Sequence, residues 1–403
     1  MAALTRLQSF YNGRDYDPGA NPGGMANAGN AVNFEPSLRD IGLVATKVGA
    51  AADAIQVMGN QAGAAVPNLT VMANVSGALA AMTATPIATL AAVLSRGLFY
   101  KTDPATVALT KTTAGTLSLK AGTVVEVAGS ILTFAADTAV TMPALTAGTD
   151  YAVYLCADGS VRADAGFTAP AGYTAATSRR IGGGHYDLTG SFNAYSLWDL
   201  KWRPACADPR GMVLVAGAFW ADIYLLGVNH PTAGTSAAGQ TIADGASPPK
   251  IPSAFGGTGS NSYGDLTWWT AAEVMAAYGK RLPTYQEFAA LAYGVTENQS
   301  VGSDPVTTQH QAGYTSKWGI EQATGVMTIW GREFAGPYGL ASYQNNNGGR
   351  GATSDLPNAA AWGGNWGDAA NSGSRLCRWD MAPTNSGNFL TARGVCNHLA
   401  LST

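Results

Sequence analysis

The chain has 403 residues, too many for one compact core, so about two to four domains are expected. Only 12% of the residues are charged and the formal net charge is −3, which excludes a strongly basic face for nucleic acid. Fifty glycines and 46% hydrophobic residues are typical of a folded, turn-rich β protein and argue against a disordered chain.

The start of the chain contains no apolar segment of signal-peptide length, and no apolar run is long enough to span a membrane. We therefore expect synthesis in a cytosol, with no membrane insertion. Free thiols are the favoured interpretation of the cysteines, because a cytosol disfavours disulfides and no CxxC spacing occurs. The four cysteines lie far apart, at Cys156, Cys206, Cys377 and Cys396.

Residues 1–97 are predicted to form an N-terminal arm and a helical or β assembly region. Residues 1–35 are rich in Gly, Asn and Pro, a composition with little local order of its own. After Pro36, apolar residues recur at three-and-four spacing from Leu38 to Met58, which predicts an amphipathic helix. Most of these side chains are small, so packing against copies of itself and packing against its own subunit both remain open.

Residues 98–182 are predicted to form a β-rich, sandwich-like intermediate domain. From Gly115 to Phe134, period-two patches alternate with Ala-Gly turns, and Ala157-Asp-Gly-Ser160 predicts a hairpin turn. Short strands at this spacing are typical of a small sandwich or barrel. Gly182-Gly-Gly184 is predicted to be a hinge into the third domain, residues 183–403.

In the third domain, capping-box patterns predict helix starts at Thr270-Ala-Ala-Glu273 and Thr284-Tyr-Gln-Glu287. Gly279 is expected to end the first of these helices. Two helices beside many short strands predict an α+β domain. Two polar stretches, Thr296 to Asp304 and Ala341 to Pro357, are expected to be extended loops that are functional or mobile.

The last part of the chain has the composition of a binding surface. Turn-forming Gly, Asn and Ser recur every few residues, and Trp362, Trp366 and Trp379 add large rigid contact areas. In such a surface rigid aromatic residues anchor a partner and small polar residues adapt to it. From Asn345 to the end the chain contains no Lys, Glu or Gln.

Ordered motifs in this segment resemble the variable region of retroelement-diversified proteins, the family of the phage major tropism determinants. The family pattern has a Gly-Gly-x-Trp turn, a Ser-Arg pair, a Trp and a closing Ala-Arg-Gly-x-Cys-x-His-Leu. In this chain the same order is given by Gly363 to Trp366, Ser374-Arg375, Trp379, and Ala392 to Leu399. One such motif would be weak, whereas the ordered series is specific.

The resemblance extends upstream and covers roughly the last half of the chain. Asp208 to Val215 and Phe219 to Gly227 look like the first strands of the family's domain. Tyr278 to Phe288 looks like the helix start shared with formylglycine-generating enzymes. The resemblance therefore implies a C-type-lectin-like domain at the C-terminus of a multidomain, β-rich protein.

The family randomises adenines in Asn codons of a template, which leaves codons that end in a pyrimidine. The resemblance therefore implies varied positions that never encode Lys, Glu, Gln, Trp or Met. The absence of Lys, Glu and Gln after Asn345 agrees with this, and is also partly chance in a lysine-poor chain. Trp366 and Trp379 fit as fixed scaffold, whereas Trp362 and Met381 fit poorly as varied positions.

The variable region is predicted at about residues 358–397, where residues between the fixed motifs have no evident structural duty. We expect them to form an exposed receptor-contact surface; the alternative is that they fill small satellite cores. Arg375 and Arg393 are expected to hold loops through hydrogen bonds to backbone carbonyls. The predicted contact residues are Trp362, Asn365, Gly367, Asp368, Ala370, Leu376, Cys377, Arg378, Asp380, Met381, Gly387, Asn388, Phe389 and Thr391.

Catalysis and metal binding are the alternatives from other classes of function. Formylglycine-generating enzymes use two cysteines a few residues apart near the C-terminus, and Cys377 and Cys396 are too far apart for this pattern. Cys396 is instead predicted to be a buried small hydrophobe, and we expect no enzyme. The histidines lack ligand spacing, and Asp368 with Asp380 is a thin basis for calcium. We expect no cofactor, with Ca²⁺ elsewhere as the alternative.

The sequence therefore predicts a homotrimeric phage tail-tip protein of the virion, made in the host cytoplasm without a signal peptide. Its expected partner is a host cell-surface receptor, taken to be a protein, and no nucleic acid. Two other functions stay open: a diversified binding protein displayed on a bacterial surface, and a structural tail-fibre protein with no receptor.

Overall fold

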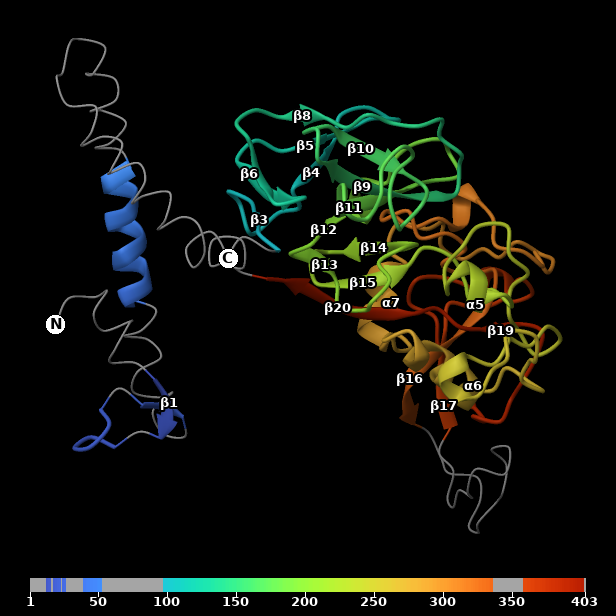
Figure 1. Cartoon of the computed structure of the whole chain (residues 1–403). Helices are drawn as coiled ribbons and strands as arrows, with labels where there is room; N and C mark the ends of the chain where they lie inside the picture. Colours follow the sequence, from blue (N-terminus) through green and yellow to red (C-terminus); the bar gives the residue numbers. More distant parts are fainter. Residues whose placement is uncertain are drawn as a thin grey trace, which may run out of the picture. The chain divides into compact units, whose positions relative to one another are not determined.

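The computed structural model describes most of the chain, whose course is shown in Figure 1. The chain divides into two compact units, Met1–Thr89 and Leu90–Thr403. No helix among the described residues is long and apolar enough to cross a membrane. The described residues are 12–15, 17–22, 24–26, 39–52, 97–335 and 358–401.

In the first unit, β1 (Asn12–Asp15) pairs in parallel with β2 (Gly24–Ala26), and a helix covers residues 39–52. The helix predicted after Pro36 is thus confirmed over these residues, and its continuation to Met58 lies outside the described part. Three apolar side chains of the helix are strongly exposed, at 39% for Ile41, 44% for Leu43 and 49% for Val48. This helix therefore presents uncovered apolar surface.

The second unit begins with a β-rich middle part. Its largest sheet has the order β10-β9-β11-β12, and two three-stranded sheets have the orders β3-β6-β7 and β4-β5-β8. The predicted turn at Ala157–Ser160 is confirmed, because it joins β9 to β10 as an antiparallel hairpin. The strands are β3 (Phe99–Tyr100), β4 (Leu109–Lys111), β5 (Leu117–Leu119), β6 (Thr123–Val127), β7 (Ser130–Phe134), β8 (Thr138–Ala139), β9 (Thr149–Cys156), β10 (Val161–Asp164), β11 (Ser178–Tyr186) and β12 (Trp198–Asp199).

The prediction of a hinge at Gly182-Gly-Gly184 is wrong, because these glycines lie inside β11 and are buried. A Cβ atom on Gly182 would come within 2.5 Å of the Trp198 carbonyl oxygen, and one on Gly183 within 2.6 Å of that of Tyr151. The glycines therefore serve close packing between strands. The sheet continues to Asp199, beyond the boundary predicted at residue 182.

The C-terminal part contains two four-stranded sheets, in the orders β13-β20-β15-β14 and β18-β17-β16-β19. In Figure 1 the first sheet lies between the middle part and the strands β16 and β17. The strands predicted near Asp208 and Phe219 are confirmed as the antiparallel pair β14 and β15. The strands are β13 (Trp202–Pro204), β14 (Met212–Val215), β15 (Phe219–Asp222), β16 (Thr328–Ala335), β17 (Asn358–Trp362), β18 (Cys377–Met381), β19 (Leu390–Thr391) and β20 (Val395–Ala400).

Three α-helices accompany these sheets among the described residues: α5 (His230–Ala233), α6 (Trp268–Ala277) and α7 (Tyr285–Leu291). The capping box at Thr284 is confirmed, with both of its reciprocal hydrogen bonds to Glu287 present. The start predicted at Thr270 is wrong, because α6 begins earlier and the hydroxyl of Thr267 caps it. Gly279, with a φ of +68°, follows the end of α6 as predicted.

Asp199 is a buried carboxylate where the chain leaves the middle part for β13. Its Oδ2 accepts hydrogen bonds from Lys101 Nζ at 2.9 Å and from the Ala108 N–H at 2.7 Å. Its Oδ1 accepts from the backbone N–H groups of Lys201 at 2.7 Å and Trp202 at 2.8 Å. One carboxylate thus satisfies four donors and ties the first residues of β13 to the middle part.

Replacing Asp199 by Asn is expected to lower the free energy of unfolding by about 3 to 5 kcal/mol. The amide leaves Lys101, 3% exposed, as a buried and unpaired charge. Urea unfolding measures the loss. Asp265→Asn changes an exposed carboxylate in the same way and should stay within about 0.5 kcal/mol of the parent protein. Similar losses in the two variants would contradict the role of Asp199.

Candidate binding surface

Trp362, the last residue of β17, anchors the segment that carries the predicted surface. Its indole is fully buried and donates a hydrogen bond of 3.1 Å to the Pro283 carbonyl oxygen. Its ring lies 5.4 Å from that of Tyr285, 6.3 Å from that of Phe288 and 5.1 Å from that of Trp379. β17 is therefore fixed to the start of α7 by one large side chain.

Arg393 fixes the other end of the segment from inside the core. Its guanidinium donates to the carbonyl oxygens of Asp222 and Ile223 at 2.8 and 2.7 Å, and to those of Glu321 and Gln322 at 2.6 and 3.2 Å. Burial lowers the pKa of Arg393 to about 10, so it stays charged at neutral pH. The predicted role of Arg393 in holding loops is confirmed.

The turn between β17 and β18 depends on two adjacent glycines. Gly363 and Gly364 have φ angles of +87° and +79°, a conformation that other residues rarely adopt. A Cβ atom on Gly364 would also lie 2.6 Å from Ser372 Oγ. The Asp368 carboxylate accepts the Asn365 N–H at 2.8 Å within the same turn. The Gly-Gly motif is therefore a backbone requirement of this turn.

The neighbouring loop Thr296–Asp304 stabilises this turn through hydrogen bonds. Glu297 accepts a hydrogen bond of 2.9 Å from the Ser374 N–H, and a second from the Ser374 hydroxyl. The Ser300 hydroxyl donates to the Trp366 carbonyl at 2.6 Å and accepts from the Ala369 N–H at 3.1 Å. The sequence indicated the loop Thr296–Asp304 but not these two residues. The other predicted loop, Ala341–Pro357, lies outside the described residues.

The structure places the predicted contact residues in three classes of exposure. Exposed residues lie in the turn, in β18 and before β19: Gly367, Ala370, Asp380 and Asn388. Partly exposed residues surround them: Asn365, Asp368, Leu376, Cys377, Arg378, Gly387 and Phe389. The remaining three are buried: Trp362, Met381 and Thr391.

Those three buried residues correct the prediction, since none of them can reach a partner. Met381 is 3% exposed and packs in a core cluster with Trp330 and Leu390. Thr391 is fully buried and its hydroxyl donates to the Ala243 carbonyl at 2.7 Å. The indole of Trp362 is the anchor described above. The sequence places these three residues at the surface because the groups that cover them are distant along the chain.

Arg375 requires a correction in the opposite direction. It is expected from the sequence to hold a loop through backbone carbonyls, as Arg393 does, but its side chain is exposed. Trp366 and Trp379, expected as buried scaffold, are each partly exposed and pack against the main core cluster. The scaffold aromatic residues therefore also border the surface.

Strand β18 presents an ion pair to solvent. Arg378 Nε lies 3.2 Å from Asp380 Oδ1, and the two side chains are 35% and 67% exposed. The hydrogen bond with Asp380 raises the pKa of Arg378, and Arg378 lowers the pKa of Asp380. An exposed pair of this kind contributes at most about 1 kcal/mol to folding. Both residues can therefore change with little effect on stability.

The predicted surface is divided between two edges of one sheet. β18 and β19 are the outer strands of the order β18-β17-β16-β19. The turn residues and β18 form one group, whereas Gly387 to Phe389 precede β19 at the opposite edge. Phe389 also packs against the core cluster that contains Leu390. The group formed by residues 365–370 and 376–380, called the β18 surface below, is therefore the stronger candidate.

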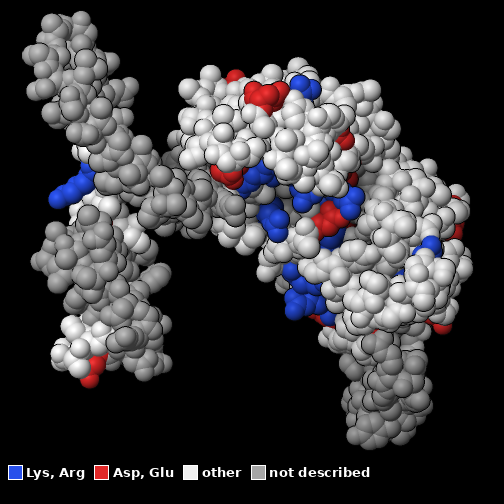
Figure 2. Space-filling view, viewed as in Figure 1, with Lys and Arg blue, Asp and Glu red and all other residues white. Residues whose placement is uncertain are grey.

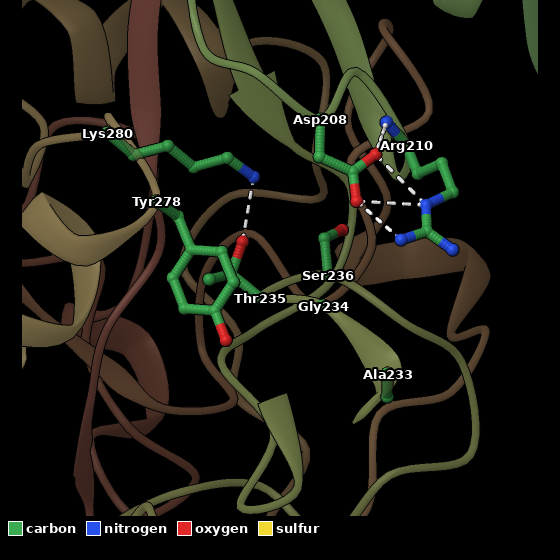
Figure 3. A pocket seen from close by; sticks show the side chains of 8 residues that line it. All are labelled: Asp208, Arg210, Ala233, Gly234, Thr235, Ser236, Tyr278 and Lys280. Carbon is green, nitrogen blue, oxygen red and sulfur yellow. Dashed lines mark hydrogen bonds and ion pairs between the residues drawn. The ribbon is translucent and has the colours of Figure 1, made fainter. Parts of the chain in front are cut away.

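Small-ligand and metal sites are the remaining kinds of binding site to consider in the described part of the chain. A pocket near β14, shown in Figure 3, has a volume of about 10 Å³, enough for about one water. In it Lys280 points to the Thr235 hydroxyl at 2.7 Å, while Asp208 pairs with Arg210. Within the described residues no group of three or more His, Cys, Asp or Glu could hold a metal ion.

Charge is sparse on the side of the molecule shown in Figure 2. Most of this face is uncharged, and its Lys and Arg residues lie in small groups. An extended basic patch, as nucleic-acid binding requires, is not seen on this face of the described residues. Charge is therefore not the main feature available for recognition on this face.

Comparisons with known proteins extend the similarity beyond the C-terminal half. A family model described as the Mtd second domain matches residues 107–198. The tail fiber receptor-binding protein of Bordetella phage BPP-1 is 52% identical over 329 residues, which cover 76% of this chain and 86% of that protein. Solved structures of the U1 and I1 variants of the Major Tropism Determinant match with TM-scores of 0.74 and 53% identity, covering 75% of this chain and 86% of theirs.

Replacing Arg393 by Met should lower the free energy of unfolding by about 3 kcal/mol or more, since buried carbonyl groups lose a charged donor. Methionine keeps the length of the side chain without its hydrogen bonds. Arg375→Met is the matched control at an exposed position, with an expected change within about 0.5 kcal/mol. Denaturant unfolding compares the two, and a small effect at Arg393 would show that the carbonyls find other partners.

Proposed function

Because this chain belongs to the family of the phage major tropism determinants, we propose that it is a receptor-binding protein at the tip of a phage tail. The observation that carries this proposal is the β18 surface, a set of exposed side chains on a backbone that buried residues hold. Its relatives are named for receptor binding and for tropism. The proposed activity is recognition of a host cell-surface receptor, with no bond made or broken.

The proposed architecture follows from the arrangement of sheets. The C-terminal part, with two four-stranded sheets and the helices α6 and α7, is proposed to be a C-type-lectin-like domain. The middle part is proposed to be a sandwich-like domain of three sheets. We place the boundary between them after Asp199 rather than at residue 182, because β11 and β12 pair in the middle sheet.

Diversification is proposed to act on the β18 surface. Arg378 and Asp380 interact mainly with each other and with solvent, so their replacement leaves the buried scaffold intact. Surface substitutions away from special features usually change stability by no more than about 0.5 kcal/mol. A retroelement that varies such positions would change the receptor while preserving the fold. The chain then needs no cofactor, and a Ca²⁺ site elsewhere is not part of the proposal.

Replacing Arg378 and Asp380 together by Ala is expected to abolish adsorption of phage to its host, while the melting temperature falls by at most a few degrees. Asp208 and Arg210 offer a matched control. They form a second Asp–Arg pair two residues apart, and their side chains are 40% and 44% exposed. Asp208→Ala with Arg210→Ala should leave adsorption unchanged. Normal adsorption by the β18 variant, or equal loss in both variants, would contradict the proposed surface.

We also propose that the chain forms a homotrimer through its N-terminal region. The exposed Ile41, Leu43 and Val48 of the helix at residues 39–52 support this, since packing against copies would cover them. Three copies would bring three β18 surfaces to one cell surface. Weak binding by each surface would then add up through effective concentration.

Light scattering on the full chain is expected to give the mass of three copies. Ile41→Lys with Val48→Lys should shift the mass toward one copy. Each copy would then bring two positive charges into the buried interface, where like charges repel. Ile131→Lys is the control, as Ile131 is 53% exposed in the middle part. It should leave the mass unchanged. A single-copy mass for the parent chain would overturn the trimer.

A further inference from the structure

Two cysteines that are far apart in sequence lie across from each other at the β13–β20 pair. In this antiparallel pair Trp202 is opposite Ala400 and Pro204 is opposite His398. The hydrogen bond of 3.0 Å from the Ala205 N–H to the Asn397 carbonyl continues the same register. One further step along the two chains places Cys206 opposite Cys396.

The hydrogen-bond pattern makes this a close pair of positions. Lys201 with Leu401, and Ala205 with Asn397, are joined by backbone hydrogen bonds. Positions between them alternate to non-hydrogen-bonded pairs, and Pro204, which has no N–H, fits such a position. Opposed residues of that type have Cα atoms about 4.5 Å apart. This separation lies within the range that a disulfide spans.

Side-chain packing also brings the two thiols together. Cys206 and Cys396 are each 2% exposed and belong to one small core cluster with Trp220 and Met212. Cys206 Sγ lies 3.2 Å from the Asp208 carbonyl oxygen and 3.5 Å from Met212 Sδ. A hydrogen bond with Cys206 lowers the pKa of Cys396, against the effect of burial, and the Lys280 ammonium lowers it further.

Neither of the other two cysteines competes for this position. Cys156 lies in β9 of the middle sheet, and Cys377 lies in β18 at the edge of the other C-terminal sheet. Cys377 and Cys396 lie in strands of different sheets, so Cys206 is the cysteine that lies beside Cys396. The pocket in Figure 3 includes Asp208 and Lys280, which also adjoin the two thiols.

We propose that Cys206 and Cys396 are a modification site, at which a small peroxide converts the two thiols to a disulfide once the protein has left a reducing cytosol. The Cys396 thiolate attacks hydrogen peroxide, gaining one oxygen as a sulfenic acid and releasing hydroxide. The Cys206 sulfur then attacks the Cys396 sulfur, and the oxygen leaves as water with the Cys206 proton. The peroxide is reduced by two electrons and the two cysteines lose two.

This bond would join the two ends of the C-terminal domain. β13 is its first strand and β20 its last, so a Cys206–Cys396 disulfide closes a loop that contains nearly the whole domain. Closing a long loop restricts the unfolded chain and stabilises the native one. The β18 surface lies in the other sheet, so its side chains stay free to vary. This inference does not depend on the proposed receptor.

The experiment uses the full chain, reduced and then treated with a small excess of hydrogen peroxide. Thiols are counted in denaturant with a disulfide reagent, and the protein is digested without reduction for mass spectrometry. We expect the count to fall from four to two, with a peptide pair joined through Cys206 and Cys396 and lighter by two hydrogens. The melting temperature should rise by about 5 °C or more, and dithiothreitol should reverse the rise.

Matched variants separate this pair from general oxidation. Cys377→Ser removes the partly exposed thiol and should lose two thiols to peroxide, as the parent does. Cys206→Ser should form no disulfide and show no rise in melting temperature. If a Ser variant fails to fold, the peptide map of the parent chain still decides. Four free thiols after treatment, or a bond between other cysteines, would overturn the proposal.

Discussion

The C-terminal part depends on a buried guanidinium that donates hydrogen bonds to the backbone of two separate segments. Arg393 has four carbonyl acceptors, two at the end of β15 and two in the loop at Glu321 and Gln322. The Ile223 carbonyl also accepts the Glu321 N–H at 2.9 Å, but a buried carbonyl left without any donor would cost about 1 to 3 kcal/mol. A planar group with five donors can satisfy all four at once, which the ammonium of lysine cannot do. The arginine of the closing motif therefore joins two segments of the core just before β20 begins.

The hydrogen bonds of Arg393 help to explain why the backbone of the candidate surface can be irregular. Residues 363–376 form almost no regular structure. The buried Trp362 fixes the start of this segment, and β18 and β20 follow it. Glu297 and Ser300 stabilise it by hydrogen bonds from a neighbouring loop. When buried contacts fix a loop at several points, its backbone conformation depends less on the exposed side chains. The Arg378–Asp380 pair illustrates the division, because its charges face solvent and each other. Stability and recognition therefore rest on different residues of the same segment.

Sequence patterns predicted the elements that depend on neighbouring residues. They failed for residues whose contacts are distant along the chain. The capping box at Thr284, the stop at Gly279 and the role of Arg393 follow from local geometry or from an ordered motif. The hinge at Gly182 was wrong because glycine also serves close strand packing, which only the pairing of β11 with β12 reveals. Trp362 was placed wrongly for the same reason, and no sequence pattern indicated that Cys206 lies beside Cys396, although the predicted free thiols are confirmed. Their neighbours, Pro283 and Cys396, are far away along the chain.

Burial and the codon rule of the family exclude some of the same residues from the predicted variable region. Codons ending in a pyrimidine cannot encode Trp or Met, and Trp362 and Met381 were the two predicted contact residues that violated this limit. Both are buried, so packing alone would prevent their variation. By contrast, the exposed and partly exposed members of the predicted set, from Asn365 to Phe389, are all residue types that such codons encode. Thr391 obeys the codon rule but is buried, so the structure restricts the varied set further than the code does.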